Sequence, residues 1–359
     1  MTAAPGVDAV VLVGGKGTRL RPLTLSAPKP MLPTAGVPYL SHLFSRIRAA
    51  GITHVVLGTS YRAEVFEEHF GDGSAVGLEL EYVVEETPLD TGGAIRNVYD
   101  RLRADNAVIF NGDILSGADL GALVETHRST GADVTLHLQR VDDPSRFGSV
   151  PTDSTGRVTE FLEKTPNPPT DQINAGCYVF KRSAIESIPA GRPVSVERET
   201  FPGLLEAGAH VQGFVDASYW LDVGTPEAFV RGSADLVRGV APTSALPGPT
   251  GDALVLDGTK VADDAVLTDG STLGAGAEIG AGARISGSVL FDAAVVGEGA
   301  VVERSVLGKG ARVGAGTVLR GVVLGDGAVV GAGCELVDGA RVWPGMTIAD
   351  GAVRFSSDA

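Results

Sequence analysis

A six-residue spacing of aliphatic side chains in the last third of the chain constrains the fold more than any other feature. From Leu267 an aliphatic residue recurs at every sixth position, with regular five-residue steps, so that 17 residues separate Leu273 from Leu290, Leu290 from Leu307 and Leu307 from Leu324. This period fits neither a helix, with about 3.6 residues per turn, nor an alternating strand, with a period of about two. It fits a triangular coil that points one aliphatic side chain inward from each of three short faces, with small residues at the corners.

The spacing therefore predicts a parallel β-helix of hexapeptide repeats. One coil alone cannot offset its chain entropy, so the coils must stack on one another. A flexible Gly/Ala-rich tail is the alternative, but disorder would not keep this register. We expect the open backbone groups of the last coil, near Val342–Ile348, to favour a homo-oligomer, with a dimer as the guess. The predicted inward residues are Leu267, Leu273, Ile279, Ile285, Leu290, Val296, Val302, Leu307, Val313, Leu319, Leu324, Val330, Leu336, Val342 and Ile348.

Before the repeats, strand-like and helix-like runs alternate from residue 8 to about residue 238. This alternation, with buried apolar strands, indicates an α/β domain with a mainly parallel sheet, in which ligands bind beyond the carboxyl ends of the strands. The runs read as strands are 8–13, 54–58, 78–84 and 106–110, and those read as helices are 39–50, 62–70, 93–103 and 118–130. A stretch rich in Pro, Gly and Ser reads as a linker. We predict an α/β domain at 1–240, a linker at 241–252 and a β-helix domain at 253–359.

The composition excludes several classes of protein. The formal net charge of −15 disfavours binding to nucleic acid or to an anionic membrane. No apolar run approaches the roughly 20 residues that span a bilayer, and the N-terminus does not read as a signal peptide. Cys177 and Cys334 are too few for a disulfide scaffold and have no metal-ligand spacing, so we expect small core residues in a cytoplasmic protein.

A glycine-rich turn with a local excess of positive charge follows the first predicted strand. Residues 14–24 read GGKGTRLRPLT, and Pro28-Lys29-Pro30 comes shortly after. Such a turn lets backbone N–H groups close on phosphate oxygens, although it is neither a Walker loop nor a dinucleotide fingerprint. Residues 1–60 carry a net charge of +5 inside this acidic chain. The segment therefore indicates a polyanionic ligand, and a triphosphate fits.

Residues 14–30 resemble the signature of the sugar-1-phosphate nucleotidyltransferases, and further motifs of that superfamily agree in order. The segments INAGCYVF, PVSVERETFP and YWLDVGTPEAF are most similar to its mannose-1-phosphate guanylyltransferase branch (GDP-mannose pyrophosphorylases). The resemblance implies a Rossmann-like, GT-A-like domain with a mainly parallel sheet, followed by a left-handed parallel β-helix. The supporting motifs are Asn111-Gly112-Asp113, Phe147-Gly148, Phe161-Leu162-Glu163-Lys164, Asn174-Ala175-Gly176 and Trp220-Leu221-Asp222-Val223-Gly224.

The resemblance also implies a reaction, in which a sugar 1-phosphate attacks the α-phosphorus of a nucleoside triphosphate and expels pyrophosphate. The attacking phosphate monoester is already ionised near neutral pH, because its second pKa is about 6, so no general base is needed. Catalysis then consists of alignment and charge neutralisation. Arg19, Lys29 and Asp113 are the expected catalytic residues, and Asp113 with Asp222 is expected to hold one Mg²⁺.

The same resemblance assigns the binding residues. Asp90 departs from the family pattern, which usually has glycine there, and Thr165 stands where proline is usual. The residues expected at the nucleotide, GTP being favoured, are Leu12, Gly14, Gly15, Gly17, Thr18, Arg19, Gly92 and Gly93. Those expected at the hexose 1-phosphate are Gly112, Gly148, Glu163, Lys164 and Asn174.

Three alternatives stay open from the sequence. The nearest is the same fold acting on another base or sugar, such as a glucose-1-phosphate thymidylyltransferase. A hexapeptide acyltransferase is disfavoured because such enzymes generally need a histidine in the β-helix, and the six histidines lie at positions 42, 54, 69, 127, 137 and 210. A catalytically silent regulatory subunit is disfavoured by the intact Arg19, Lys29, Asp113 and Asp222.

Overall fold

The computed structural model describes residues 2–60 and 62–354, and the chain divides into two compact units that are interleaved in sequence. The first, the α/β unit, consists of Met1–Gly15 and Leu43–Trp220. The second, the β-helix unit, consists of Lys16–His42 and Leu221–Ala359. The segment with the nucleotidyltransferase signature therefore packs with the C-terminal part of the chain. The boundaries predicted at residues 240 and 252 divide the chain into consecutive domains, unlike these interleaved units, and they remain a prediction.

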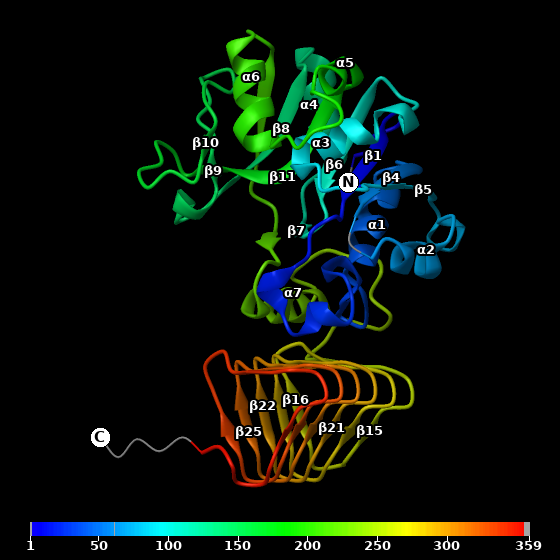
Figure 1. The fold of residues 1–359 in the computed structure, drawn as a ribbon, viewed down its shortest axis with the longest axis vertical. Helices are drawn as coiled ribbons and strands as arrows, with labels where there is room; N and C mark the ends of the chain where they lie inside the picture. The colour runs from blue at the N-terminus through cyan, green and yellow to red at the C-terminus, as the bar shows by residue number, and fades with distance from the viewer. Residues whose placement is uncertain (1, 61, 355–359) are drawn as a thin grey trace. The chain divides into compact units, whose positions relative to one another are not determined.

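A mixed sheet forms the centre of the α/β unit (Figure 1). Its path runs β10-β9-β11-β6-β1-β4-β5, and β8 joins it through β11 and also pairs with β12. The four strands β6, β1, β4 and β5 are parallel, whereas β11 runs antiparallel to β6 and to β8. The strands of this sheet are β1 (Asp8–Leu12), β4 (His54–Thr59), β5 (Glu79–Val84), β6 (Asn106–Asn111), β8 (Val134–Arg140), β9 (Gly148–Ser149), β10 (Leu162–Glu163), β11 (Gln172–Lys181) and β12 (Val211–Asp216). The short strand β7 (Ile114–Ser116) lies outside it.

The helices of this unit confirm most of the sequence prediction. Gly92 and Gly93 lie in the first turn of a helix that begins at Asp90 and ends at Asn97, so the predicted helix over 93–103 is wrong at both ends. The chain continues past this end as a short 3-10 turn at Tyr99–Arg101. The helices are α1 (Tyr39–Ala49), which starts in the β-helix unit, α2 (Glu64–Phe70), α3 (Asp90–Asn97), α4 (Leu120–Thr130), α5 (Arg182–Glu186) and α6 (Phe201–Glu206).

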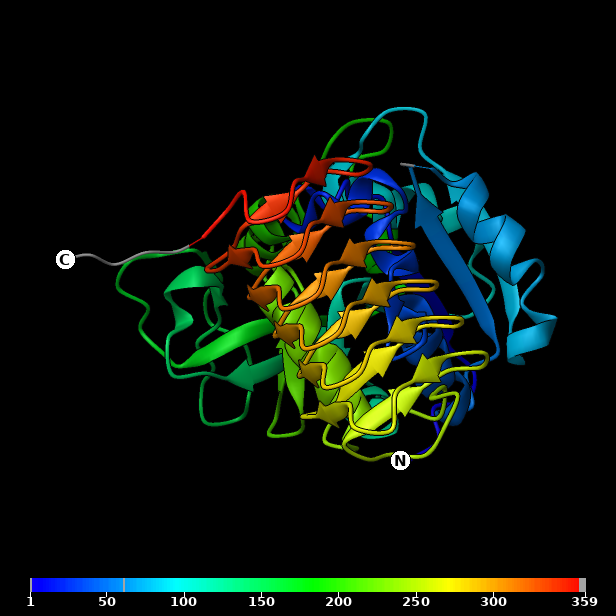
Figure 2. The same cartoon turned by 90° about the horizontal axis from the view of Figure 1, so that it is seen from below.

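Three stacks of short parallel strands form the β-helix (Figure 2). Leu273, Leu290, Leu307 and Leu324 align across one stack, as their 17-residue spacing predicts, and the last step, to Val342, takes 18 residues. The predicted inward residues form one apolar core, with Leu267 and Ile348 partly buried at its ends. The left-handed β-helix predicted from the sequence is therefore confirmed.

Each stack of the β-helix has its own set of strands. The first contains β14 (Ala253–Val255), β17 (Ser271–Leu273), β20 (Val289–Leu290), β23 (Val306–Leu307), β26 (Val323–Leu324) and β29 (Arg341–Val342). The second contains β15 (Lys260–Val261), β18 (Glu278–Ile279), β21 (Val295–Val296), β24 (Arg312–Val313), β27 (Val329–Val330) and β30 (Thr347–Ile348). The third contains β16 (Val266–Thr268), β19 (Arg284–Ser286), β22 (Val301–Glu303), β25 (Val318–Arg320) and β28 (Glu335–Leu336).

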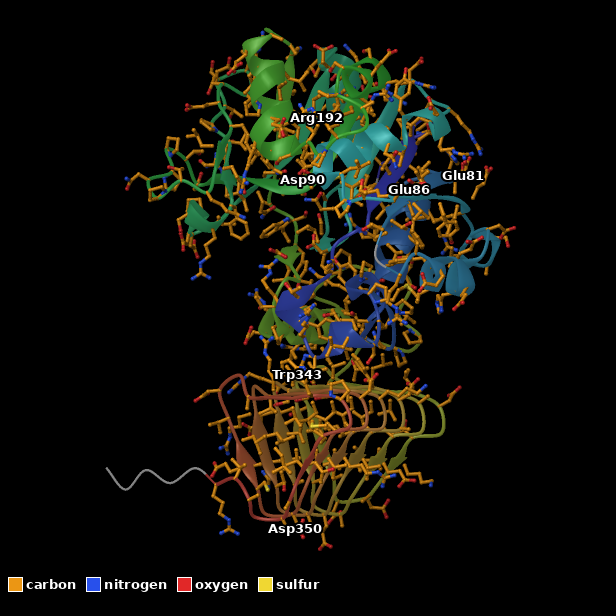
Figure 3. The ribbon with its side chains drawn as sticks, in the orientation of Figure 1. Glu81, Glu86, Asp90, Arg192, Trp343 and Asp350 are labelled. Carbon is orange, nitrogen blue, oxygen red and sulfur yellow. The ribbon has the colours of Figure 1, made fainter. Side chains whose placement is uncertain are left out.

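Polar side chains at the corners of the coils bind backbone N–H groups of neighbouring coils. The Ser271 hydroxyl accepts from the Ser288 N–H at 3.3 Å, the Ser288 hydroxyl from Ser305 at 3.1 Å, and the Ser305 hydroxyl from Val322 at 3.0 Å. Asp350, labelled on a corner in Figure 3, accepts from the N–H of Ala332 at 2.8 Å. These bonds repeat with the coil and satisfy backbone donors that would otherwise be buried without partners.

The outward side of the first stack is buried rather than exposed. Thr272, Val289, Val306 and Val323 occupy its outward positions and are at most 2% exposed. Helix α7 (Pro226–Val237) packs with this part of the unit: the hydroxyls of Ser233 and Thr272 lie 3.3 Å apart, and the N–H of Ala35, in the segment 16–42, donates to the Ser233 hydroxyl at 2.9 Å. Two short strands, β2 (Pro33–Thr34) and β3 (Val37–Pro38), belong to the same segment, and β13 (Trp220–Asp222) leads the chain from one unit into the other.

Among the helices of the described residues, none combines the length and the apolar character needed to cross a membrane.

Candidate active site

The ends of β1 and β6 form a tightly packed edge of the α/β unit. Leu12 ends β1 and aligns with Asn111 on β6, and the N–H of Gly112 donates to the Leu12 carbonyl at 3.0 Å. A Cβ on Gly112 would lie 2.6 Å from that carbonyl oxygen, so only glycine fits. Asp113 follows in the turn before β7, at the carboxyl end of a parallel strand, where α/β sheets bind their ligands.

The two glycines after β1 differ in their surroundings. The carbonyl of Gly14 accepts from the Ser60 hydroxyl at 2.7 Å, and a Cβ on Gly14 would lie 2.8 Å from that hydroxyl oxygen. A Cβ on Gly15 would meet nothing within 4 Å. The second glycine is therefore open on the side where a side chain would stand, as a turn that admits a phosphate requires.

An irregularity in β11 places Asn174 close to β6. The pairing with β8 shifts register between Asn174 and Tyr178, and Gly176 has a positive φ of 75°. The amide of Asn174 donates to the Tyr178 hydroxyl at 2.9 Å and its oxygen accepts from the Gly176 N–H at 3.0 Å. Burial raises the pKa of Tyr178 well above its ordinary value, so this hydroxyl stays protonated. Asn174 is thereby held in one orientation.

Gly148, Glu163 and Lys164 come together on a short hairpin. Glu163 on β10 pairs with Gly148 on β9, and a Cβ on Gly148 would lie 3.0 Å from a Glu163 carboxylate oxygen. The Lys164 ammonium lies 3.4 Å from the other oxygen of Glu163, and 62% of the Lys164 side chain is exposed. Lys164 also has a positive φ of 50°, and its N–H donates to the Phe147 carbonyl at 3.2 Å. The hairpin thus offers one accessible cation beside one carboxylate.

Gly92 and Gly93 pack against a neighbouring segment. Both N–H groups donate to the Val194 carbonyl, at 2.7 and 3.1 Å. A Cβ on Gly92 would lie 2.9 Å from the Thr200 hydroxyl, and one on Gly93 would lie 2.8 Å from the Arg192 carbonyl. Close packing therefore explains both glycines, and their contact with a nucleobase stays a prediction.

The departure from the family pattern at Asp90 has a conformational basis. Asp90 has a φ of 59°, in the left-handed region that glycine adopts most easily and that aspartate and asparagine tolerate better than other residues. Its carboxylate accepts from the N–H of Thr91 at 2.7 Å. Asp90 can therefore replace glycine without a change of backbone. Figure 3 labels it near Arg192.

Thr91, in α3, and Glu197 interact although neither is among the predicted site residues. The Thr91 hydroxyl donates to the Glu197 carboxylate at 2.8 Å and accepts from the Val196 N–H at 2.9 Å. Glu197 lies in a π-helical turn, Val196–Thr200, and also accepts from the Ser195 hydroxyl at 3.1 Å. The segment PVSVERETFP carried the only signal, because it is part of the resemblance to the guanylyltransferases.

The rest of the predicted site lies in the β-helix unit. Gly17 has a φ of 58°, and its carbonyl accepts from the Thr24 hydroxyl at 2.9 Å. Thr18 begins a single 3-10 turn, Thr18–Leu20, and a Cβ on Gly17 would lie 3.0 Å from the Cβ of Lys29. Lys29 starts a second such turn, Lys29–Met31, and is only 8% exposed. The signature segment is thus folded closely upon itself.

Arg19 and Asp222 meet around Gly224. A Cβ on Gly224 would lie 2.6 Å from a terminal nitrogen of the Arg19 guanidinium and 2.9 Å from Oδ1 of Asp222. Glycine at this position leaves room for a cation and a carboxylate that come from distant parts of the sequence. The structure therefore brings together two predicted site residues separated by about 200 positions.

A metal at the site fits the chemistry of the predicted donors. Within residues 2–60 and 62–354, no group of three or more His, Cys, Asp or Glu side chains could hold a metal ion. Mg²⁺ keeps several waters and takes one or two carboxylates together with phosphate oxygens. Asp113 and Asp222 each offer a carboxylate of the kind that Mg²⁺ accepts, and their binding of one ion stays a prediction.

The two cysteines are buried and free, as predicted. Burial raises the pKa of the Cys177 thiol to about 12, so this thiol stays protonated at neutral pH.

The fold consists of a Rossmann-like α/β unit with a mixed sheet and a left-handed β-helix. Comparison with family models gives the class: residues 8–239 match Nucleotidyl transferase and residues 250–354 match the GMPPB C-terminal domain. The chain belongs to the nucleotidyl transferase family and is a nucleotidyltransferase. Members of this family generally use a divalent metal ion.

Particular relatives narrow the comparison. The chain is 65% identical over 353 residues to a mannose-1-phosphate guanylyltransferase of Mycobacterium tuberculosis, covering 98% of both proteins. It is 36% identical over 234 residues to the catalytic subunit beta of the Drosophila pseudoobscura pseudoobscura enzyme, covering 64% of this chain and 62% of the relative. HddC from Yersinia pseudotuberculosis, solved in complex with GMP-PN, is similar at 29% identity and a TM-score of 0.57, covering 64% of this chain and 99% of HddC.

Proposed function

We propose that this nucleotidyltransferase joins GTP and mannose 1-phosphate to give GDP-mannose and pyrophosphate. A phosphate oxygen of mannose 1-phosphate attacks the α-phosphorus of GTP, and the bond to the departing pyrophosphate breaks. The observation that carries this proposal is the 65% identity, over 98% of both chains, to a mannose-1-phosphate guanylyltransferase. A cytoplasmic location, supported by two buried free cysteines, and a homo-oligomeric state are part of the same proposal.

The protein's part in this reaction is to hold two anions together and cancel their repulsion. Arg19 and Lys29 bind the triphosphate: the Arg19 guanidinium grips phosphate oxygens bidentately and the Lys29 ammonium acts as a point charge. The turn around the phosphates contains Leu12, Gly14, Gly15, Gly17 and Thr18. The nucleobase lies against Gly92 and Gly93. Asp113 and Asp222 hold a Mg²⁺ ion, which supplies further neutralisation of charge on the phosphates.

The hairpin of β9 and β10 binds the sugar phosphate in this proposal. Lys164, with its exposed ammonium, binds the phosphate of mannose 1-phosphate. Glu163 and Asn174 bind sugar hydroxyls, with the backbone of Gly148 and Gly112 alongside. The partners of Asn174, Tyr178 and Gly176, fix its amide so that little entropy is lost on binding.

Pyrophosphate release from a matrix of triphosphates and sugar phosphates tests the substrate assignment. We expect the highest kcat/KM with GTP and mannose 1-phosphate among GTP, dTTP, UTP and ATP paired with mannose 1-phosphate and glucose 1-phosphate. A preference for dTTP with glucose 1-phosphate would instead make the chain a thymidylyltransferase.

Asp113→Asn should lower kcat by at least about 100-fold with the fold intact, because a carboxylate charge is lost where the metal binds. Near-normal Mg²⁺-dependent turnover in that variant would remove Asp113 from the site.

A further inference from the structure

One arginine of the β-helix binds the backbone of the signature segment. Arg341 lies on β29, the last strand of the first stack, and one of its terminal nitrogens donates to the carbonyl of Arg19 at 2.9 Å and to that of Arg21 at 2.7 Å. All three residues belong to the β-helix unit. Both hydrogen bonds are charge-assisted and therefore stronger than neutral ones.

The position of Arg341 in the repeat shows how unusual it is. Register pairing places it next to Val323, in the column that holds Thr272, Val289 and Val306 in earlier coils. Those residues are buried and uncharged. In the coil that contains β29 this column holds Arg341, and the Arg341 side chain reaches the carbonyls of Arg19 and Arg21. Repeat architecture alone does not require this change, because valine fits the column in the three preceding coils.

The segment that Arg341 binds carries Arg19. The Arg19 carbonyl accepts from Arg341, while the Arg19 guanidinium lies with Asp222 at Gly224. The backbone here is one 3-10 turn, closed by bonds from Leu20 to the Gly17 carbonyl and from Arg21 to the Thr18 carbonyl. Short 3-10 turns have poor hydrogen-bond geometry, so external bonds decide how firmly such a turn is held.

We propose that Arg341 is a positioning residue that orders the signature segment and so aims the Arg19 guanidinium at the triphosphate. The effect of Arg341 on the triphosphate rests on the proposed function. Its ordering of the backbone of the signature segment does not. The β-helix thereby contributes to turnover without touching either substrate.

Two variants and a matched control test the proposal in the full-length protein. Arg341→Met keeps the apolar stem and removes the donors, and Arg341→Lys keeps a charge on a shorter side chain. Arg312→Met is the control, because Arg312 occupies an outward position of β24 on the second stack. We expect Arg341→Met to speed amide hydrogen exchange across residues 17–25 and to lower kcat/KM for GTP about tenfold, with an unchanged KM for mannose 1-phosphate. Arg341→Lys should recover part of the loss, and the thermal midpoints of Arg341→Met and Arg312→Met should agree.

Each other outcome is decisive. Unchanged hydrogen exchange in Arg341→Met would overturn the ordering role, and faster exchange with normal kcat/KM would overturn the link to Arg19. A wild-type protein without turnover on any pair in the substrate matrix would overturn the proposed function instead. The exchange measurement would still judge whether Arg341 orders the segment, because it needs no substrate.

Discussion

The β-helix and the α/β unit both satisfy buried polar groups, but they do so with different kinds of sequence information. In the β-helix, Ser271, Ser288 and Ser305 repeat the same bond at intervals of 17 residues. In the α/β unit such contacts follow no sequence period: His54 on β4 bonds Asp8 on β1 at 2.8 Å, and His137 on β8 lies 3.6 Å from Asp216 on β12. A contact of the β-helix can therefore be predicted from the neighbouring coil, whereas a contact of the α/β unit has no repeated counterpart from which to predict it.

The largest expected effect tests the inward positions of the β-helix. Leu307→Ala removes a fully buried side chain that packs between Leu290 and Leu324, and should reduce the free energy of unfolding by about 2–5 kcal/mol. Val266→Ala, at a position that is 46% exposed on the third stack, should cost no more than about 0.5 kcal/mol. Denaturant unfolding of both variants measures the difference, and equal costs would contradict the assignment of inward and outward positions.

The next effect separates two reasons for glycine. Gly112→Ala places a Cβ 2.6 Å from the Leu12 carbonyl oxygen and should lower the free energy of unfolding by about 1–3 kcal/mol. Gly15→Ala places its Cβ in open space and should leave the free energy of unfolding nearly unchanged. Gly310 in the β-helix also faces open space but has a φ of 66°, so Gly310→Ala should cost about 1 kcal/mol through backbone strain alone.

Asparagine distinguishes the two cases, because it tolerates the left-handed region and is larger than alanine. Gly310→Asn should be more stable than Gly310→Ala, and Gly112→Asn should be no better than Gly112→Ala. Thermal melts of the four variants give the ranking. An improvement by asparagine at Gly112 would mean that conformation, and not crowding, requires glycine there.

The smallest effect concerns pH and involves two histidines of the α/β unit. The hydrogen bond to Asp8 raises the pKa of His54 above 6.5, so its contribution to stability is complete below that pH and is lost as pH rises through the raised value. Burial lowers the pKa of His127 to about 4, so its cost appears as pH falls from 6.5 toward 4. The stability difference between wild type and His54→Asn should therefore shrink from pH 6 to pH 8. As pH falls from 7 to 5, the thermal midpoint of His127→Asn should rise relative to that of wild type. As pH rises, His54→Asn should therefore become more stable relative to wild type and His127→Asn less stable. Relative thermal midpoints that change in the same direction with pH for both variants would contradict these assignments.

The same contrast explains how far the sequence could predict this molecule. The inward series from Leu267 to Ile348 was predicted residue by residue because the repeat is local and each step confirms the last. Four strands of the α/β unit, β1, β4, β5 and β6, were predicted from apolar runs, whereas β8, β9, β10, β11 and β12 were not. The start of α3 at Asp90 was missed, because it depends on an aspartate in a left-handed conformation and on the distant Val194 carbonyl.

The candidate site follows the same rule. Arg19, Lys29, Asp113 and Asp222 were predicted as site residues from family motifs and not from their spacing, and their roles stay predictions. Thr91 with Glu197 and Arg341 with Arg19 were missed, since each pair joins residues at least 100 positions apart without a shared pattern. Arg341 could have been singled out only as the charged member of a column that is otherwise uncharged.

The burial of the outward valines on the first stack has a consequence for the independence of the parts. Val289, Val306 and Val323 are buried in the same column as Thr272, which lies beside Ser233 of α7, so a chain ending before residue 253 would lose the strand that packs on α7. Residues 1–240 therefore do not form a module that is independent of the coils. Coils could be added or removed at the far end of the stack with little effect on α7, whereas substitutions in the strand beside α7 must stay compatible with that helix.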